Sequence, residues 1–250
     1  MSSSQPPTRL GPDLFRSLFD RIYVINLPDR TDRRREMLAE LRRIGMEGDP
    51  VVEFFPAVRP ADKGEFGSRG ERGCFLSHLG VMKDAVAKGH RSILILEDDV
   101  GWTRAALARM ARLDALRTTD WAFLHGGQGH DRPASDGAIR LERLDPEREL
   151  LLGHFIGLRG EAIGQLVAYL EAMLGRPNGS PEGGPMHVDG AYSWFRRAHP
   201  DVAAYVCVPS VARQRSSRSD ISVPRGWRAT KAADLARRFA RAIRALSPRG

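Results

Sequence analysis

The stretch SILILEDDV, residues 92–100, decides the fold, because a run of apolar side chains ends abruptly in three carboxylates. Residues 93–96 show no polar alternation, which is typical of a strand buried on both faces of a parallel sheet. Glu97, Asp98 and Asp99 follow at the carboxyl end of that strand, where open α/β sheets bind their ligands. Adjacent carboxylates repel one another unless a cation separates them, and oxygen ligands suit Mn²⁺ or Mg²⁺. We therefore expect a divalent-cation site here; a solvated acidic turn is the simpler alternative.

Strand-like and helix-like segments alternate around this stretch. The predicted strands cover residues 21–27, 51–58, 92–100, 121–126, 140–144, 154–159 and 203–209. The predicted helices cover residues 29–45, 70–90, 103–116, 161–174 and 189–198. In the second helix, Phe75, Leu79, Met82 and Val86 form the expected buried stripe. This alternation is typical of an α/β domain with right-handed crossovers, and the Gly/Pro-rich loop at 175–185 suggests a substrate loop.

The composition predicts a globular protein. The chain has 250 residues, of which 42% are hydrophobic, and two cysteines, Cys74 and Cys207. No apolar run reaches the ~18 residues that a membrane helix needs, and the N-terminus does not have a signal-peptide pattern. Two isolated cysteines suit a reducing compartment, so we expect a cytoplasmic protein.

The net charge of +8 is concentrated near the C-terminus, in residues 213–249. We expect three parts: a flexible N-terminal arm (1–20), a catalytic domain (21–222) and a basic amphipathic helix or tail (223–250). Such a tail could lie on an anionic membrane, such as the inner face of the cytoplasmic membrane, or pack on the domain with its arginines solvated. The rest of the chain is roughly balanced in charge, which argues against nucleic-acid binding.

Two classes of metal-binding protein carry acidic residues at the end of such a strand. In receiver domains of response regulators the acidic pair opens the domain, and an essential lysine follows later. Here the triplet lies far into the chain and no lysine occurs between Lys88 and Lys231, which excludes that class. In nucleotide-sugar transferases a DxD-type motif holds the cation that bridges the donor diphosphate. The triplet fits this second class, with Asp99 as the main metal ligand and Glu97 beside it.

Six motifs in a fixed order support the transferase class: YVINLPDRTDRR (23–34), FFPAV (54–58), GERGCFLSHLGVM (70–82), ILILEDDV (93–100), VDGAYSWF (188–195) and VPSVARQRSSRSDI (208–221). Together they closely resemble glycosyltransferase family 25, which includes bacterial lipooligosaccharide β-galactosyltransferases and is related to the collagen galactosyltransferases. Met82 stands where many members carry Trp. The resemblance implies a GT-A-type, Rossmann-like nucleotide-sugar-binding domain with a mixed central sheet and helices on both faces. It also implies an inverting transfer from a nucleotide-activated hexose, most often UDP-galactose.

The resemblance, with the positions of the motifs, indicates which residues bind the nucleotide sugar. Arg30 and Arg33 follow the first strand, where a helix N-terminus also offers N–H groups to a diphosphate, and Asn26 can bind the base or ribose. Gly70 and Gly73 are expected to bracket a turn that lets the backbone approach a ligand. The predicted donor-binding set is Asn26, Leu27, Arg30, Arg33, Ala57, Val58, Gly73, Ser77, Glu97, Asp98 and Gln214.

An inverting transfer also needs a general base that deprotonates the acceptor hydroxyl. Asp189, which starts a helix after the Gly/Pro-rich loop, is the predicted base, and His187 is the fallback; a helix N-cap is the simpler role for Asp189. His78 is the second predicted catalytic residue, as a contact to donor or acceptor. Further candidates for metal or diphosphate contacts are His125, Arg213, Arg215 and Asp220.

The sequence therefore predicts a metal-dependent inverting glycosyltransferase that adds a hexose to a lipooligosaccharide, a lipopolysaccharide or another cell-surface glycan or glycolipid. Two alternatives remain open. A nucleic-acid-binding protein that uses the Arg-rich tail would bind with a steep dependence on salt. A degenerate transferase would bind a nucleotide sugar without turning it over.

Overall fold

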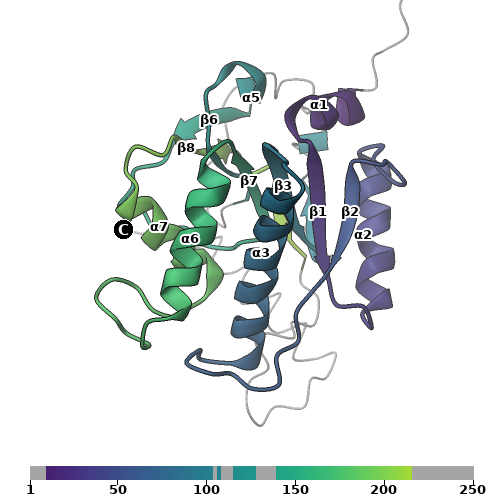
Figure 1. Ribbon diagram of the computed structural model, residues 1–250. Helices are drawn as coiled ribbons and strands as arrows, with labels where there is room; N and C mark the ends of the chain where they lie inside the picture. The colour runs from purple at the N-terminus through teal and green to yellow at the C-terminus, as the bar shows by residue number, and fades with distance from the viewer. Residues whose placement is uncertain (1–9, 104–105, 108–114, 128–138, 216–250) are drawn as a thin grey trace, which may run out of the picture.

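The computed structural model describes residues 10–103, 106–107, 115–127 and 139–215, and Figure 1 labels its helices and strands. In chain order they are α1 (Leu10–Leu18), β1 (Arg21–Asn26), α2 (Thr31–Arg43), β2 (Val52–Pro56), α3 (Arg69–Ala87), β3 (Ser92–Glu97), β4 (Val100–Trp102), α5 (Ala115–Thr118), β5 (Phe123–His125), β6 (Arg140–Arg143), β7 (Phe155–Arg159), α6 (Ala162–Leu174), α7 (Val188–Ala198), β8 (Ala204–Val208) and β9 (Ala212–Gln214). Each strand predicted from the sequence has a counterpart here.

Seven strands form one mixed sheet in the order β2-β1-β3-β7-β5-β8-β6. β1 pairs in parallel with β2 and β3, so the three strands that precede the acidic triplet end at the same edge. β7 lies antiparallel between β3 and β5, while β8 is parallel to β5 and β6 closes the far edge. The prediction of an α/β fold with a mixed central sheet is confirmed.

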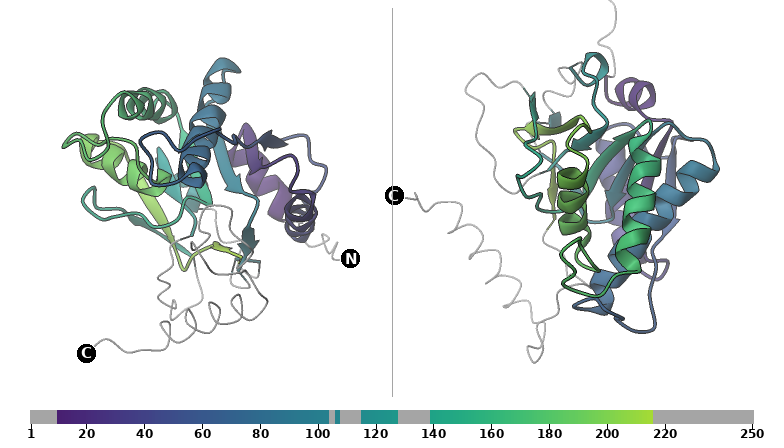
Figure 2. Two further views of the ribbon diagram at one scale, coloured as in Figure 1. Left: turned by 90° about the horizontal axis from the view of Figure 1, so that it is seen from below. Right: turned by 60° about the vertical axis from the view of Figure 1, so that its left-hand side comes forward.

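Helices cover both faces of this sheet, as Figure 2 shows. Successive residues of β1 point to opposite faces: Ile22 and Val24 pack in the core that includes residues of α1 and α2. Tyr23 and Ile25 pack in the second core, to which α3, α6 and α7 contribute. All strand residues 22–26 are buried, because each face of the strand meets a helical layer.

The N-terminal segment corrects one prediction. Residues 10–18 were expected to belong to a flexible arm, but they form helix α1, and Phe15, Leu18 and Phe19 are buried against the sheet. The Phe15 ring lies 5.6 Å from the ring of Trp102, at the end of β4. The expectation of an arm is therefore wrong for this helix, because its apolar face is part of the core; residues 1–9 lie outside the described residues.

Helix α3 corrects a second prediction. Phe75, Leu79 and Met82 are buried as expected, but Val86 is 51% exposed. Ser77 and His78, which are not part of the predicted stripe, are almost fully buried as well. The middle of α3 is thus enclosed on more than one side, by the sheet and by the neighbouring helices α6 and α7.

Some predictions fall partly or wholly outside the described residues. The basic tail (223–250) and Asp220 lie there entirely. Of the helix predicted over 103–116, the start is described: the Thr103 hydroxyl accepts a hydrogen bond from the backbone N–H of Ala106, as an N-cap does. None of the helices in the described part of the chain is long and apolar enough to span a membrane.

Candidate functional site

A cavity of about 470 Å³ opens at the carboxyl ends of β1, β2 and β3, beside the first half of α3. Of the residues predicted from the sequence, those that line it are Leu27, Arg33, Ala57, Val58, Gly73, Ser77, His78, Glu97, Asp98, Asp99 and Gln214. The parallel pairing of β1 with β2 and β3 explains this convergence, because it places the loops after these strands at one edge.

The two aspartates of the triplet are held in different ways, although both are buried. Asp98 has a partner on each oxygen: Arg33 Nη1 donates to Oδ1 at 2.8 Å and Asn26 Nδ2 donates to Oδ2 at 2.7 Å. Asp99 accepts from Gln214 Nε2 on Oδ2 at 3.1 Å. Within the described residues, no donor reaches its Oδ1. Asp98 is therefore satisfied by the protein, whereas Asp99 presents an unmatched buried acceptor.

The electrostatics of Asp99 agree with this difference. Burial, together with the negative charges of Glu97 and Asp98, raises the pKa of Asp99 to about 7, although Arg33 opposes the rise. A buried carboxylate that lacks a partner is costly, and a cation bound to it would remove that cost. The residues present thus fit a divalent cation, which Asp99 and Glu97 would hold.

Glu97 forms one end of a buried chain of polar groups. Its Oε1 lies 3.3 Å from His78 Nε2, and His78 Nδ1 lies 2.7 Å from the Tyr192 hydroxyl. Because a carboxylate only accepts, Nε2 must carry the proton on this side, so the tyrosine hydroxyl donates to Nδ1 when the imidazole is neutral. Burial raises the pKa of Glu97, but the His78 contact outweighs it and the pKa is lowered overall. Both ring nitrogens of His78 are thus used inside the protein.

Cys74 completes this group on the cavity wall. Its sulfur lies 3.8 Å from Glu97 Oε1, and the ligand atoms of Cys74, His78 and Glu97 lie within 4.8 Å of one another. Burial and the neighbouring carboxylate of Glu97 raise the pKa of the Cys74 thiol well above its ordinary value. The thiol therefore acts as a weak hydrogen-bond donor to Glu97 rather than as a nucleophile.

Gly73 and Ser77 serve the junction between α3 and the segment after β2. Gly70 and Gly73 were expected to bracket a turn. Both instead lie in the first turns of α3, whose N-cap is Ser68. A Cβ on Gly73 would lie 2.6 Å from the carbonyl oxygen of Val58, so only glycine allows this close approach. The Ser77 hydroxyl accepts from the Val58 N–H at 2.8 Å and fixes the same contact.

Three residues of the predicted donor-binding and catalytic sets, Asn26, Arg30 and Asp189, do not line the cavity. Asn26 donates to Asp98, behind the wall, and Arg30 pairs with Asp32 at 3.0 Å. The carboxylate of Asp189 accepts from the backbone N–H of Leu152 at 3.1 Å and of Gly190 at 2.9 Å.

The segment that Asp189 holds is strained. Leu152 has a φ of 73°, in the left-handed region that favours glycine. Its N–H is bound by Asp189, and its carbonyl oxygen accepts from Nε2 of the buried His125 at 2.7 Å. Burial lowers the pKa of His125 to about 4, so the ring is neutral. His125, considered as an alternative metal ligand, therefore fixes this backbone, and such strain is often found at functional sites.

Two residues near the end of the described chain, Gln214 and Arg215, hold the acidic turn through hydrogen bonds. β9 pairs antiparallel with β4, which sets Gln214 opposite Val100. Arg215 donates to the carbonyl oxygens of Asp98 and Val100 at 2.6 and 3.0 Å, and its backbone N–H donates to that of Asp99 at 2.7 Å. Arg215, a candidate for the diphosphate, is thus a structural clamp on the turn.

The sequence analysis missed several residues of the site. Those that line the cavity without having been predicted as site residues are Ile25, Arg59, Pro60, Arg69, Gly70 and Cys74. Tyr192 was missed as well, although it lies inside the motif VDGAYSWF. The spacing of apolar residues in α7 could have indicated that Tyr192 is buried. The spacing could not have indicated its contact with His78 on α3.

Comparisons with known proteins find similarity to one family over part of the chain. A family model described as glycosyltransferase family 25 (LPS biosynthesis protein) matches residues 53–130, which include Asp98, Asp99 and most of the cavity wall. The human "Inactive glycosyltransferase 25 family member 3" is 28% identical over 156 residues, 54% of this chain and 25% of that protein. Human "Procollagen galactosyltransferase 2" is 30% identical over 131 residues, 44% of this chain and 21% of that protein.

A solved structure, a glycosyltransferase involved in the glycosylation of the major capsid of PBCV-1, is 13% identical and covers 76% of this chain and 81% of its own, with a TM-score of 0.44. That score is too low to support any inference from the likeness. The chain spans about a quarter of the length of the curated relatives it matches. The family match includes the acidic triplet, and the relatives named here carry the names of family 25 or of a galactosyltransferase, so over this region the chain is similar to glycosyltransferase family 25.

Proposed function

We propose that this chain is a metal-dependent inverting glycosyltransferase that transfers a hexose, in the first instance galactose from UDP-galactose. The observation that carries the proposal is the buried Asp99 Oδ1, which has no hydrogen-bond partner among the residues that the structure describes and lies on the wall of a cavity that Glu97 also lines. A cavity of about 470 Å³ falls in the size range of small-ligand sites. The name of the human procollagen galactosyltransferase supports the choice of galactose.

Asp99 and Glu97 would hold Mn²⁺ or Mg²⁺, which when bound would offset the negative charge of a departing nucleoside diphosphate. The other groups on the wall would bind and orient the donor. Leu27, Ala57 and Val58 offer an apolar surface for the base, and His78 keeps the Glu97 carboxylate in one orientation through Oε1. We propose a positioning role for His78 in place of a direct contact, because both its ring nitrogens already have protein partners.

For the general base we retain Asp189 as the proposal and give it a discriminating test. Its carboxylate accepts from the Leu152 N–H on Oδ2 and from the Gly190 N–H on Oδ1, and the single oxygen of an asparagine can keep the Leu152 contact. If Asp189 is the base, Asp189→Asn will lose transfer activity while keeping donor affinity and stability. If Asp189 only positions Leu152, the same variant will keep its activity and Asp189→Ala will lose it. His187, the fallback base, is exposed and lies 3.8 Å from Glu71.

We propose that the acceptor is a lipooligosaccharide, lipopolysaccharide or related glycan or glycolipid. A glycolipid acceptor suits an enzyme in the cytoplasm that meets the inner face of the membrane, where the basic residues of 223–250 would contact anionic lipid. Transfer to a panel of such acceptors, with vesicle co-sedimentation of the full chain and of a chain ending at residue 222, tests these two parts.

The first experiment is thermal unfolding of the wild type and Asp99→Asn with Mn²⁺ and a panel of UDP-, GDP- and CMP-sugars. A donor that binds the native state raises its melting temperature by linkage. We expect a metal-dependent rise with one donor in the wild type and none in Asp99→Asn. A wild type that responds to no nucleotide sugar in the panel would refute the proposed function.

The second candidate function is nucleotide-sugar binding without transfer. It is favoured by one observation, the name "Inactive glycosyltransferase 25 family member 3" of the human relative. Release of UDP from the donor that shifts the melting temperature, with and without acceptor, separates the two. Tight binding with no turnover on any acceptor would favour the second candidate.

A further inference from the structure

Arg30 and Arg33, which were predicted to bind the diphosphate, are engaged elsewhere. Arg33 donates to Asp98 at 2.8 Å and lies 3.9 Å from Asp99, buried between the two carboxylates. Arg30 lies outside the cavity and pairs with Asp32. A ligand with two phosphate groups would therefore need positive partners from another part of the wall.

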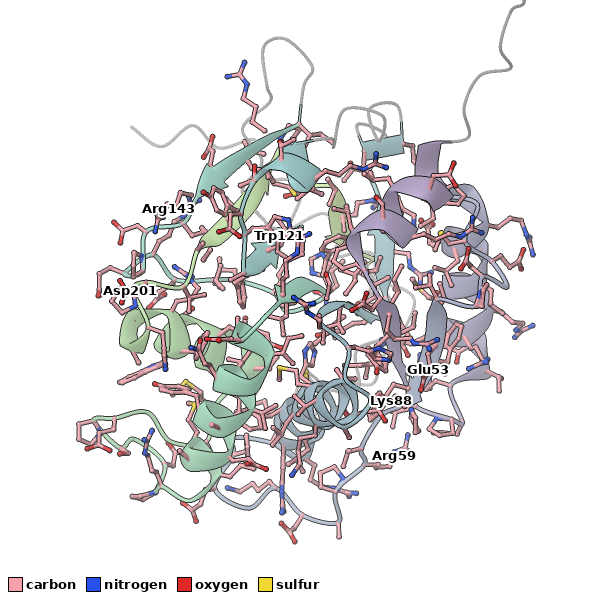
Figure 3. The ribbon with its side chains drawn as sticks, turned by 45° about the horizontal axis from the view of Figure 1, so that its top comes forward. Glu53, Arg59, Lys88, Trp121, Arg143 and Asp201 are labelled. Atoms are coloured by element: carbon pink, nitrogen blue, oxygen red, sulfur yellow. The ribbon has the colours of Figure 1, made fainter. Side chains whose placement is uncertain are left out.

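Two further guanidinium side chains line the cavity: Arg59, after β2, and Arg69, the first residue of α3. Arg59, labelled in Figure 3, pairs with Asp29 at 3.0 Å, and the two side chains are 55% and 59% exposed. An ion pair so exposed contributes little to stability and is easily exchanged for another anion. Arg69 donates to the carbonyl oxygen of Pro60 through Nε and Nη2, at 3.1 and 2.9 Å.

The N-terminus of α3, where Arg69 and Gly70 lie, also borders the cavity and adds to the positive potential. The helix has 19 residues, and Ser68 caps the N–H of Glu71. Gly70 also lines the cavity, and its N–H, in the first turn, lacks an acceptor within the helix. The helix dipole and these N–H groups favour an anion.

The unmatched oxygen of Asp99 is the second, independent sign of a ligand in the same cavity. This oxygen would bind a cation, whereas Arg59, Arg69 and the N-terminus of α3 would bind an anion. A cavity lined by both suits a ligand that carries a metal ion and phosphate groups together, as a metal-bound nucleoside diphosphate does.

We infer that Arg59, Arg69 and the first turn of α3 form the subsite for the diphosphate of the donor, with Arg59 exchanging Asp29 for a phosphate oxygen. The inference rests on the proposed function, because it supposes a nucleoside-diphosphate ligand. Arginine binds phosphate through two parallel hydrogen bonds, which makes this exchange favourable. Asp29 competes with the phosphate for the same guanidinium.

Calorimetry of UDP and uridine in Mn²⁺ tests the subsite, since the two ligands differ only in the diphosphate. We expect Arg59→Ala and Arg69→Ala to weaken UDP binding by about 10- to 100-fold and to leave uridine binding unchanged. Asp29→Asn should act in the opposite direction, strengthening UDP binding by about two- to threefold, and this gain should vanish in an Arg59→Ala background.

Arg42→Ala is the matched control, because Arg42 forms a solvent-exposed ion pair with Glu47 at the end of α2, and neither residue lines the cavity. It should change neither affinity. Wild-type UDP affinity in Arg59→Ala and Arg69→Ala, with unaltered melting temperatures, would overturn the subsite while leaving the proposed function intact. A wild type that binds neither UDP nor a UDP-sugar would overturn both.

Discussion

Replacing Asp99 with asparagine should stabilise the metal-free protein while removing its metal site. In the folded protein the pKa of Asp99 is raised from 3.8 to about 7, chiefly by burial and by the negative charge of Glu97. Below the unfolded value the carboxyl is protonated in both states. Between 3.8 and 7 the unfolded chain loses this proton and the folded protein keeps it, so stability falls as the pH rises. The full loss is reached above pH 7 and amounts to at most about 4 kcal/mol.

The assay is urea unfolding in the presence of a chelator at several pH values from 5 to 8.5. Asp99→Asn keeps the side-chain volume, so we expect its unfolding free energy at pH 8 to exceed that of the wild type by about 2–4 kcal/mol. The unfolding free energy of Asp99→Asn should also decrease less steeply with rising pH than that of the wild type. With Mn²⁺ and UDP added, the difference in unfolding free energy between the variant and the wild type should shrink or change sign, because only the wild type is stabilised by ligand binding.

Asp98→Asn is the matched control, one residue away and equally buried. Asp98 accepts from Arg33 and Asn26, so its loss of charge leaves the Arg33 guanidinium without its carboxylate. Removing one member of a buried pair costs about 3–5 kcal/mol. The two neighbouring substitutions should therefore change stability in opposite directions. If Asp99→Asn lowers stability at pH 8 in chelator as Asp98→Asn does, the assignment of Asp99 as the unmatched carboxylate is wrong.

Three further substitutions probe the surroundings of the cavity. Tyr192→Phe removes the hydroxyl that donates to His78, so urea unfolding should show a loss of about 1–2 kcal/mol and calorimetry a weaker affinity for UDP; unchanged affinity would deny the positioning role. Gly73→Ala sets a Cβ 2.6 Å from the Val58 oxygen, and the expected cost of about 1–3 kcal/mol would be contradicted by an unaltered unfolding midpoint. Leu152→Gly relaxes a φ of 73°, so stability should stay within about 1 kcal/mol of the wild type, and a larger loss would mean that the Leu152 side chain matters more than its backbone strain.

The sheet could be predicted from the sequence where its signals are local. The apolar runs of β1 and β3 have no alternation because both faces are buried, and that pattern can be read directly. The insertion of β7 between β3 and β5 could not be read, because it depends on pairing between segments far apart in the chain. Helix α1 was missed although Leu14, Phe15, Leu18 and Phe19 form an apolar face, since its stability comes from packing against the sheet.

The site was predictable at the level of motifs but not of individual partners. Asp98 and Asp99 are identical side chains in sequence, and only the reach of Arg33 and Asn26 separates a satisfied carboxylate from an unmatched one. Arg59 and Arg69 lie 10 residues apart in sequence, each next to a motif (54–58 and 70–82) but outside it, and the close contact between Gly73 and Val58 brings the two segments to one wall. Contacts of this kind are set by tertiary packing, which spacing along a chain does not encode.

The pairing of β4 with β9 has a consequence for the order in which the protein becomes functional during synthesis. Gln214 reaches Asp99 across 115 positions of sequence, and Arg215 binds the carbonyl oxygens of the same turn. A nascent chain that has emerged only as far as β8 already contains all seven strands of the main sheet, yet its acidic turn lacks these partners. Ribosome-bound chains arrested before residue 212 should fold the main sheet but should not bind the ligand. Ligand binding should appear only when β9 has left the exit tunnel.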